Sequence, residues 1–102
     1  MPVDLIVLYR PPTDPAAFDR HYRTVHVPLV HEMPHLVAFE TSTGPVDTQG
    51  GDPVHFVARL RFASHDDLGA SMASPEGVTA LADLANFAQA GAVVVTAEVA
   101  EA

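Results

Sequence analysis

The stretch Val54–Phe62, VHFVARLRF, is the clearest guide to the fold of this chain. Every second residue in it is apolar, and these residues share one face: Val54, Phe56, Ala58, Leu60 and Phe62. The opposite face holds His55, Val57, Arg59 and Arg61. A period of two predicts a β-strand with one dry face and one more polar face. Such a strand needs neighbours that cover its dry side.

Three further strands are predicted on either side of this one. Val3–Tyr9 (VDLIVLY) is almost continuously apolar, which is typical of a strand covered on both faces. Pro11 and Pro12 end it, because proline cannot continue a hydrogen-bonded ladder. Leu36–Ser42 reads as the second strand and Ala92–Val99 as the last. The segment between the second and third strands is rich in glycine and proline and is expected to be a loop.

Helices are predicted between these strands. The first runs from about Pro15, with Asp14 as its cap, to His31, and Pro28 is expected to kink or loosen its last turn. Its apolar stripe is formed by Phe18, Tyr22, Val25 and Leu29. Ser64 opens a short helix that ends near Ala73. Ser74 caps another that is expected to reach Gly91.

The resulting order is β-α-β-β-α-β in one domain that spans residues 1–102. It predicts a ferredoxin-like α+β fold, with a four-stranded antiparallel sheet covered by helices on one face. The other sheet face needs cover, and apolar residues point to both sides of the first and last strands. Two sheets packed face to face would meet that need, so a homodimer that forms an α/β barrel is expected.

Charge and composition exclude several classes of partner. The chain has five Lys and Arg residues and thirteen Asp and Glu residues, a formal net charge of −8. This charge disfavours binding to nucleic acid and to anionic membranes. Cysteine is absent, so disulfides and thiolate sites are ruled out. No basic signal-peptide start is present, and no apolar run approaches the ~20 residues of a membrane helix. A cytoplasmic protein is expected.

His26 is the leading candidate for a catalytic residue. On a helical wheel it lies at the edge of the apolar stripe, where a cavity between helix and sheet would open. An imidazole there would act as general acid or base near neutral pH. The alternative is a boundary histidine that bonds the backbone or faces water. Tyr22, one turn earlier, would either share the cavity or serve as a core aromatic residue.

Other candidates lie on or near the strands. His55 and Arg59 share the polar face of the third strand, so they line either a site or a polar interface, and Tyr9 ends the first strand. No dedicated metal site is expected from the six histidines. His21, His26 and His31 are five apart, which turns each by about 140° around an α-helix and keeps them from converging.

Several of these residues together resemble the EthD family. The first half contains Tyr9-Arg10-Pro11-Pro12, Asp14-Pro15-Ala16-Ala17-Phe18, Tyr22, His26-Val27-Pro28-Leu29 and Met33-Pro34. The second half contains Ser74-Pro75-Glu76, Asp83-Leu84, Asn86-Phe87 and Val93-Val94-Val95. The likeness covers nearly the whole chain. One departure is Pro34-His35, where the family usually has Pro-Gly, so the geometry of that turn is open and His35 would stand near the pocket mouth.

The resemblance implies a dimeric α/β barrel with a ligand cavity near His26 and, less directly, Tyr22. Relatives take part in ether breakdown, lactone isomerisation and aromatic polyketide tailoring, often without a cofactor, and none is expected here. The family thus narrows the fold more than the function.

Three functions compete. The first is a cofactor-free enzyme that moves a proton on a small apolar lactone, enol or aromatic polyketide-like metabolite, in a pocket lined by residues such as Phe39, Phe56 and Phe62. The second is a non-catalytic carrier or accessory binder of a hydrophobic metabolite. The third is haem or monooxygenase chemistry.

Overall fold

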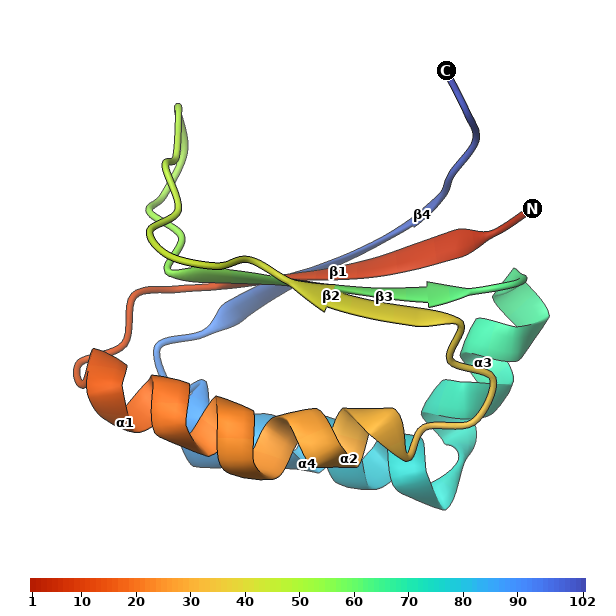
Figure 1. The fold of residues 1–102 in the computed structure, drawn as a ribbon, viewed down its shortest axis with the longest axis horizontal. Coiled ribbons are helices and arrows are strands. Elements are labelled where there is room, and N and C mark those ends of the chain that lie inside the picture. Colours follow the sequence, from red (N-terminus) through yellow and green to blue (C-terminus); the bar gives the residue numbers. More distant parts are fainter.

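A four-stranded antiparallel sheet and a layer of helices on one of its faces form the computed structural model, which describes residues 1–102 (Figure 1). The strands are β1 (Val3–Tyr9), β2 (Ala38–Thr41), β3 (Phe56–Phe62) and β4 (Ala92–Glu98). They lie in the order β2-β3-β1-β4, with β1 at the centre between β3 and β4. The predicted ferredoxin-like α+β fold is therefore confirmed.

The paired strands β2 and β3 are shorter than the sequence suggested. The segment predicted as Leu36–Ser42 pairs only over Ala38–Thr41, and the third strand starts at Phe56 instead of Val54. His55 donates its backbone N–H to the Tyr9 carbonyl but lies in a bend just before β3. The alternation of the strand therefore does not extend to His55.

The first helical segment is continuous but contains a wide turn. It consists of α1 (Pro15–His21), the π-helix η1 (Tyr22–His26) and α2 (Val27–His31). Asp14 caps its start by accepting a hydrogen bond from the Ala17 N–H at 3.1 Å. Directly before Pro28, the five residues of η1 form a π-helix, and the Val27 N–H bonds the Tyr22 carbonyl five residues back. The missing N–H of Pro28 thus coincides with a change of helix type.

This wide turn changes which side chains face the sheet. The buried residues of the segment are spaced by four: Phe18, Tyr22, His26 and Val30. Val25 was predicted to lie in the apolar stripe, but it is 40% exposed. A π-turn holds more residues than an α-turn, so it rotates Val25 outward and brings His26 to the middle of the buried face. The predicted position of His26 at the edge of that face is corrected accordingly.

Two capped helices complete the layer: α3 (His65–Ala73) and α4 (Pro75–Phe87). The hydroxyls of Ser64 and Ser74 accept hydrogen bonds from the backbone N–H of Asp67 and Gly77 at 3.1 and 3.0 Å, as expected of helix caps. The second of these helices ends at Phe87, short of the predicted Gly91. A turn that Gly91 completes at φ 100° leads into β4. None of the helices combines the length and apolarity needed to span a bilayer.

The two faces of the sheet differ in character. The helix-facing side packs in the core through Val3, Leu5, Val7, Tyr9, Ala58, Leu60 and Phe62. By the pairing register, the outer face presents Ile6, Leu8, Val57, Val93 and Val95. Beside them lies a charged cluster in which the Arg61 Nε–H donates to the Asp4 carboxylate at 2.7 Å and Arg59 pairs with Glu40. No helix covers this outer face (Figure 1).

Candidate active site

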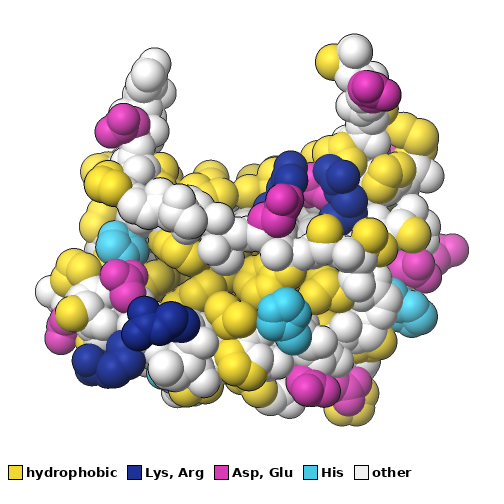
Figure 2. All heavy atoms as spheres, in the orientation of Figure 1, with side chains coloured by type: hydrophobic (Ala, Val, Ile, Leu, Met, Phe, Trp, Pro, Cys, Tyr) yellow, Lys and Arg dark blue, Asp and Glu magenta, His cyan; other side chains and the backbone are white.

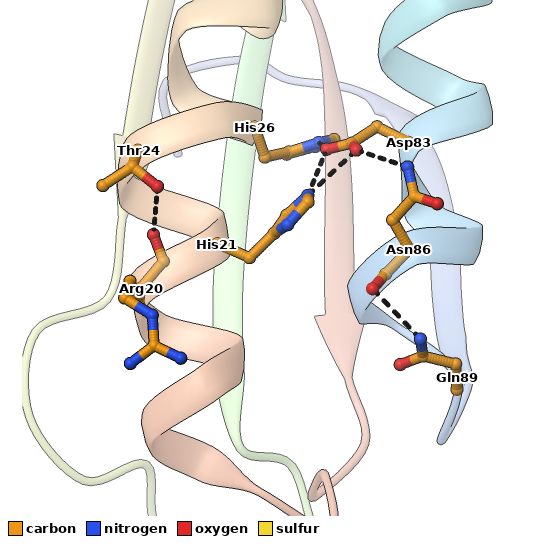
Figure 3. A network of polar contacts seen from close by, with 7 residues as sticks. All are labelled: Arg20, His21, Thr24, His26, Asp83, Asn86 and Gln89. Atoms are coloured by element: carbon orange, nitrogen blue, oxygen red, sulfur yellow. Dashed lines mark hydrogen bonds and ion pairs between the residues drawn. The ribbon is translucent and has the colours of Figure 1, made fainter.

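Asp83 of α4 is the buried centre of a polar cluster between two helical segments. Its carboxylate accepts hydrogen bonds from His26 Nδ1 at 2.9 Å, from His21 Nε2 at 2.9 and 3.1 Å, and from Asn86 Nδ2 at 2.9 Å (Figure 3). Asp83 and His26 are each only 5% exposed. Figure 3 shows both imidazoles pointing from the first helical segment toward α4. The cluster joins residues some 60 positions apart in the sequence.

The protonation states in this cluster follow from its hydrogen bonds. Burial raises the pKa of Asp83, but the hydrogen bonds from Asn86, His21 and His26 outweigh it and hold that pKa below its ordinary value. An ionised carboxylate only accepts hydrogen bonds, so each imidazole must donate to it. His26 therefore has its proton on Nδ1. Burial lowers the pKa of His26 more than Asp83 raises it, so near neutral pH its Nε2 is an unprotonated base.

An apolar cavity of about 60 Å³ adjoins this histidine. Thirteen of its fifteen lining residues are hydrophobic, and they come from the helix-facing side of the sheet, from the first helical segment and from α3 and α4. His26 and Tyr22 both line it, and so does Tyr9. Leu81 and Val94 also line it and are 52% and 50% exposed, so the cavity opens to solvent between α4 and β4.

Tyr22 stands beside His26 with an unused hydroxyl. The two rings lie 5.2 Å apart, and the Tyr22 hydroxyl is buried without a hydrogen-bond partner. Burial raises the pKa of Tyr22, so the phenol stays protonated and available as a donor. The ring of Tyr9 is 5.7 Å from that of Tyr22, and burial raises the pKa of Tyr9 as well. An unpaired buried hydroxyl is costly unless something binds it.

A second, larger groove of about 810 Å³ lies on the other side of Tyr22. Tyr22 lines both spaces; the groove is also bounded by Arg23, His55, Phe56 and the segment after β2. Figure 2 shows this side of the molecule hollowed between the helical layer and the sheet, with hydrophobic side chains in the hollow. His55 Nε2 lies 3.2 Å from Asp19 Oδ1, and its ring edge packs on Phe18 at 5.0 Å.

The remaining predicted site residues lie apart from His26. His55 and Arg59 were expected to share one face, but His55 turns toward α1 while Arg59 lies on the outer face of the sheet with Glu40 and Asp4. The strand begins after His55, which is why the alternation fails there. Phe62 is fully buried in the core, and Phe39 packs on His31 at 5.4 Å. Neither Phe62 nor Phe39 lines the cavity or the groove.

The sequence analysis missed Asp83, Asn86 and His21 as parts of the site. Asp83 interrupts the apolar face of α4, and a lone carboxylate there was a readable signal. The expectation that His21 and His26 point apart is wrong, because both donate to one carboxylate. Two residues five apart point in different directions in an α-helix. In a π-helix, where hydrogen bonds reach five residues back, they lie on nearly the same side. No group of three or more candidate ligands is arranged to hold a metal ion.

The fold places this chain among ferredoxin-like α+β domains, and within the chain a buried histidine–aspartate pair lies beside an apolar cavity. Residues 10–91 match the family model described as EthD domain, and the chain belongs to that family. An uncharacterized 11.0 kDa protein from the thcB-thcC intergenic region of Rhodococcus erythropolis is 45% identical over 87 residues, which are 83% of this chain and 82% of the relative.

Solved structures agree with this assignment. A crystal structure of an EthD family protein from Bacillus halodurans is 28% identical and superposes with a TM-score of 0.88, covering 98% of this chain and 100% of that one. More distant structures share the fold alone. One is a dimeric ferredoxin-like protein of unknown function from Thermobifida fusca, with 20% identity and a TM-score of 0.72, covering 97% of this chain and 92% of that one. Another is SnoaB, a cofactor-independent oxygenase from Streptomyces nogalater, with 14% identity and a TM-score of 0.69, covering 99% of this chain and 95% of that one.

Proposed function

We propose that this protein is a cofactor-free enzyme in which His26, oriented by Asp83, moves a proton on a small apolar lactone, enol or aromatic polyketide-like metabolite. The single observation behind this proposal is the hydrogen bond of 2.9 Å between His26 Nδ1 and the Asp83 carboxylate, beside an apolar cavity. It leaves Nε2 of His26 as the free base. In the proposed step, Nε2 takes a proton from an acidic C–H or O–H bond and returns it to another atom of the same molecule.

The environment of His26 suits such a step. Asp83 stabilises the imidazolium that forms, because the two groups are paired in a water-poor space. The negative charge that develops on the substrate oxygen needs a donor, and the Tyr22 hydroxyl is unpaired and adjacent. No oxidant or metal is required, since the proton leaves and returns within one molecule.

The size of the cavity constrains the substrate. A benzene-sized ligand needs a space on the order of 150 Å³, more than the 60 Å³ present. The substrate would therefore insert only its reacting end, or displace the exposed rim at Leu81 and Val94. A haem is far larger than this space, so it would not fit in the cavity beside His26. Cofactor-independent chemistry has a precedent in the fold of SnoaB, which supports the proposal by analogy only.

Exchange of substrate protons with solvent tests the proposal without knowledge of the product. The protein is incubated in D₂O with a panel of apolar ketones, lactones and enols, and deuterium incorporation is followed by mass spectrometry. The His26→Ala variant should lose about 10²–10⁴-fold of the rate on any compound that the wild type exchanges. His65→Ala is the matched control, because His65 is exposed and pairs only with Glu98.

A carrier of hydrophobic metabolites is the second candidate, favoured by the apolar lining of the cavity. A carrier would bind a compound of the panel with similar affinity in wild type and His26→Ala, and would exchange none of its protons above the rate in buffer. Exchange that persists undiminished in His26→Ala would refute the role of His26.

We further propose that the protein forms a homodimer through the outer face of its sheet. That face carries an uncovered apolar patch: Ile6, Leu8, Val57, Val93 and Val95. Val93 and Val95 are 39% and 42% exposed in the single chain. Contiguous apolar patches on a protein surface mark interaction sites, and a second copy of the same sheet face would cover this one. The dimeric ferredoxin-like protein of Thermobifida fusca supports the proposal by its fold.

A further inference from the structure

We propose that the groove beside Tyr22 is a binding site for a small amphipathic anion, and that Arg23 recognises its acidic group. The ligand is an organic molecule with an aromatic or alicyclic body and one carboxylate or sulfonate. This proposal does not depend on proton transfer at His26. Its evidence is an arginine without a carboxylate partner on the edge of a groove that has apolar walls.

The first helical segment presents one stripe of residues to the groove. Asp19, Arg23 and Val27 all line the groove and are spaced by four, so they follow one side of the helix. Tyr22 and His26 each come one residue before a member of this stripe and belong to the buried face. Tyr22 lines both the groove and the cavity, so a ligand in the groove would lie against the wall of the cavity.

Arg23 is a cation without an anionic partner in a chain that is rich in carboxylates. Three of the five basic side chains pair with carboxylates: Arg10, Arg59 and Arg61. Asp19 lies four residues before Arg23, the spacing at which ion pairs form on a helix. The Asp19 carboxylate turns instead to His55, whose Nε2 lies 3.2 Å from Oδ1. The exposed guanidinium of Arg23 is therefore left to bind an anion from solution.

The walls of the groove would hold the apolar body of such a ligand. Phe56 of β3 and Val54 just before it line the strand side, and Val27 lines the helix side. The volume of about 810 Å³ lies within the range of ligand pockets, roughly 300–1,000 Å³. Figure 2 shows hydrophobic side chains in this hollow and basic side chains of the first helical segment beside it.

Thr41 and Thr43 add hydrogen-bond donors at the end of β2. Both line the groove, and neither side-chain hydroxyl makes a hydrogen bond within the chain. Thr41 pairs with Ala58 in the sheet register, so its side chain lies on the helix-facing side. A guanidinium donates two parallel hydrogen bonds to a carboxylate, and free hydroxyls suit the remaining oxygen lone pairs. The groove should therefore bind an anion better than a neutral molecule of the same shape.

The other charges of the chain do not reverse this preference. Asp19 is the acidic residue that lines the groove, and it is already paired with His55. The formal net charge of −8 acts at longer range, and salt at about 0.1 M screens exposed charges beyond about 10 Å. The contact with Arg23 therefore decides which ligand the groove selects.

The test compares two dyes that differ by one sulfonate: 1-anilinonaphthalene-8-sulfonate and the neutral N-phenyl-1-naphthylamine. Fluorescence titration at pH 8 and about 0.1 M salt measures both affinities. The wild type should bind the sulfonate at least about threefold more tightly than the neutral dye. Arg23→Gln should weaken sulfonate binding by about fivefold or more and change binding of the neutral dye by less than about twofold.

Arg20→Gln is the matched control. It also removes one exposed, unpaired cation from the same helical segment, but Arg20 borders the separate hollow beside His21. Both affinities should stay within about twofold of the wild type in this variant, because the general loss of one positive charge is largely screened.

Valine methyl signals in NMR spectra locate the bound dye. Val27 and Val54 line the groove, whereas Val93 and Val95 lie on the outer sheet face, where an apolar dye would also adhere. The sulfonate should shift the signals of Val27 and Val54 in the wild type. At the same dye concentration, Arg23→Gln should reduce these shifts.

Equal affinity of the two dyes for the wild type would overturn the proposal, as would an equal loss of sulfonate binding in Arg23→Gln and Arg20→Gln. Shifts confined to Val93 and Val95, or binding of neither dye, would overturn it as well. Neither measurement involves turnover. Failure of the proposed function would therefore appear as absent proton exchange with the dye preference intact, and failure of the anion site as a lost preference with proton exchange intact.

Discussion

At the scale of single residues, the site depends on which nitrogen of His26 has the proton. The Asp83 carboxylate accepts hydrogen bonds from three side chains and, being ionised, donates none. His26 must therefore donate from Nδ1, and its tautomer is fixed by Asp83. His26 itself lines the apolar cavity, together with Tyr22. Asp83 on α4 thus fixes both the orientation and the tautomer of the His26 imidazole on the first helical segment.

His35 has a backbone conformation that is unfavourable for a residue other than glycine. Its φ of 65° lies in the left-handed region, where a non-glycine residue costs about 1–2 kcal/mol. Its ring lies 4.0 Å from the Asp67 carboxylate, an exposed pair that contributes little. His35→Gly should therefore stabilise the protein by about 0.5–1 kcal/mol after the entropy of the unfolded glycine is subtracted, and raise Tm by about 2–6 °C.

The control for that prediction is His35→Ala, which loses the same ring but keeps a Cβ. Thermal unfolding of the three proteins by circular dichroism should show a rise for the glycine variant alone. Equal midpoints for glycine and alanine would mean that the left-handed backbone costs nothing at this position.

At the scale of elements, the π-helix η1 decides the composition of the site. A regular α-helix over Pro15–His31 would turn Val25 toward the sheet and separate His21 from His26. The wide turn instead buries His26 and brings both histidines to Asp83. π-bulges are frequent at functional sites, and here the reason is geometric.

The corner between α3 and α4 depends on a glycine. A Cβ on Gly77 would lie 2.0 Å from the Ser71 carbonyl oxygen, which is backbone and cannot move aside alone. Gly77→Ala should therefore destabilise the protein by about 1–3 kcal/mol, despite the higher helix propensity of alanine. Urea unfolding at pH 7 measures this change.

Gly69 in α3 provides the matched control. A Cβ there meets nothing within 4 Å, so Gly69→Ala should stabilise the protein by about 0.5–1 kcal/mol through helix propensity. A destabilisation of similar size in both variants would show that the close approach at Gly77 is not the cause.

At the scale of the whole molecule, one sheet face is packed and the other is open. Val95→Asp places a charge among the apolar residues of the outer face and should convert the proposed homodimer to monomers, as measured by light scattering during size exclusion. Val78 lies on the surface of α4 and is 56% exposed, so Val78→Asp should leave the measured mass of the assembly unchanged. A monomeric wild type would refute the dimer.

The stability of the molecule should also depend on pH through its buried cluster. Burial lowers the pKa of His26 in the folded chain, so below about pH 6.5 the unfolded state binds more protons there and the free energy of unfolding falls. The contribution of one such group cannot exceed about 1.4 kcal/mol per pH unit. His26→Gln should show a shallower decrease than the wild type between pH 7 and 5 in urea unfolding. An equal or steeper decrease would contradict the assignment of His26 as a buried neutral group.

Much of this architecture is readable from the sequence because it is local. The strand Val3–Tyr9, the caps at Asp14, Ser64 and Ser74, and the alternation after Phe56 follow from side chains acting on their own backbone. The order of these elements then leaves few possible topologies. The candidates His26 and Tyr22 were also found this way, together with a resemblance that runs along the chain.

Only the tertiary structure decided how the site is assembled. Asp83 lies more than fifty residues from both histidines, and the approach of two helices across the sheet is not encoded in the spacing of either one. The change to a π-helix before Pro28 likewise depends on packing, since it trades regular hydrogen bonds for the burial of His26. Long-range pairing also separates His55 from Arg59. The pairing of β3 with β1 ends at Phe56 opposite Tyr9, so His55 lies outside the strand. Local chemistry set the elements of this protein, and long-range packing chose which side chains meet.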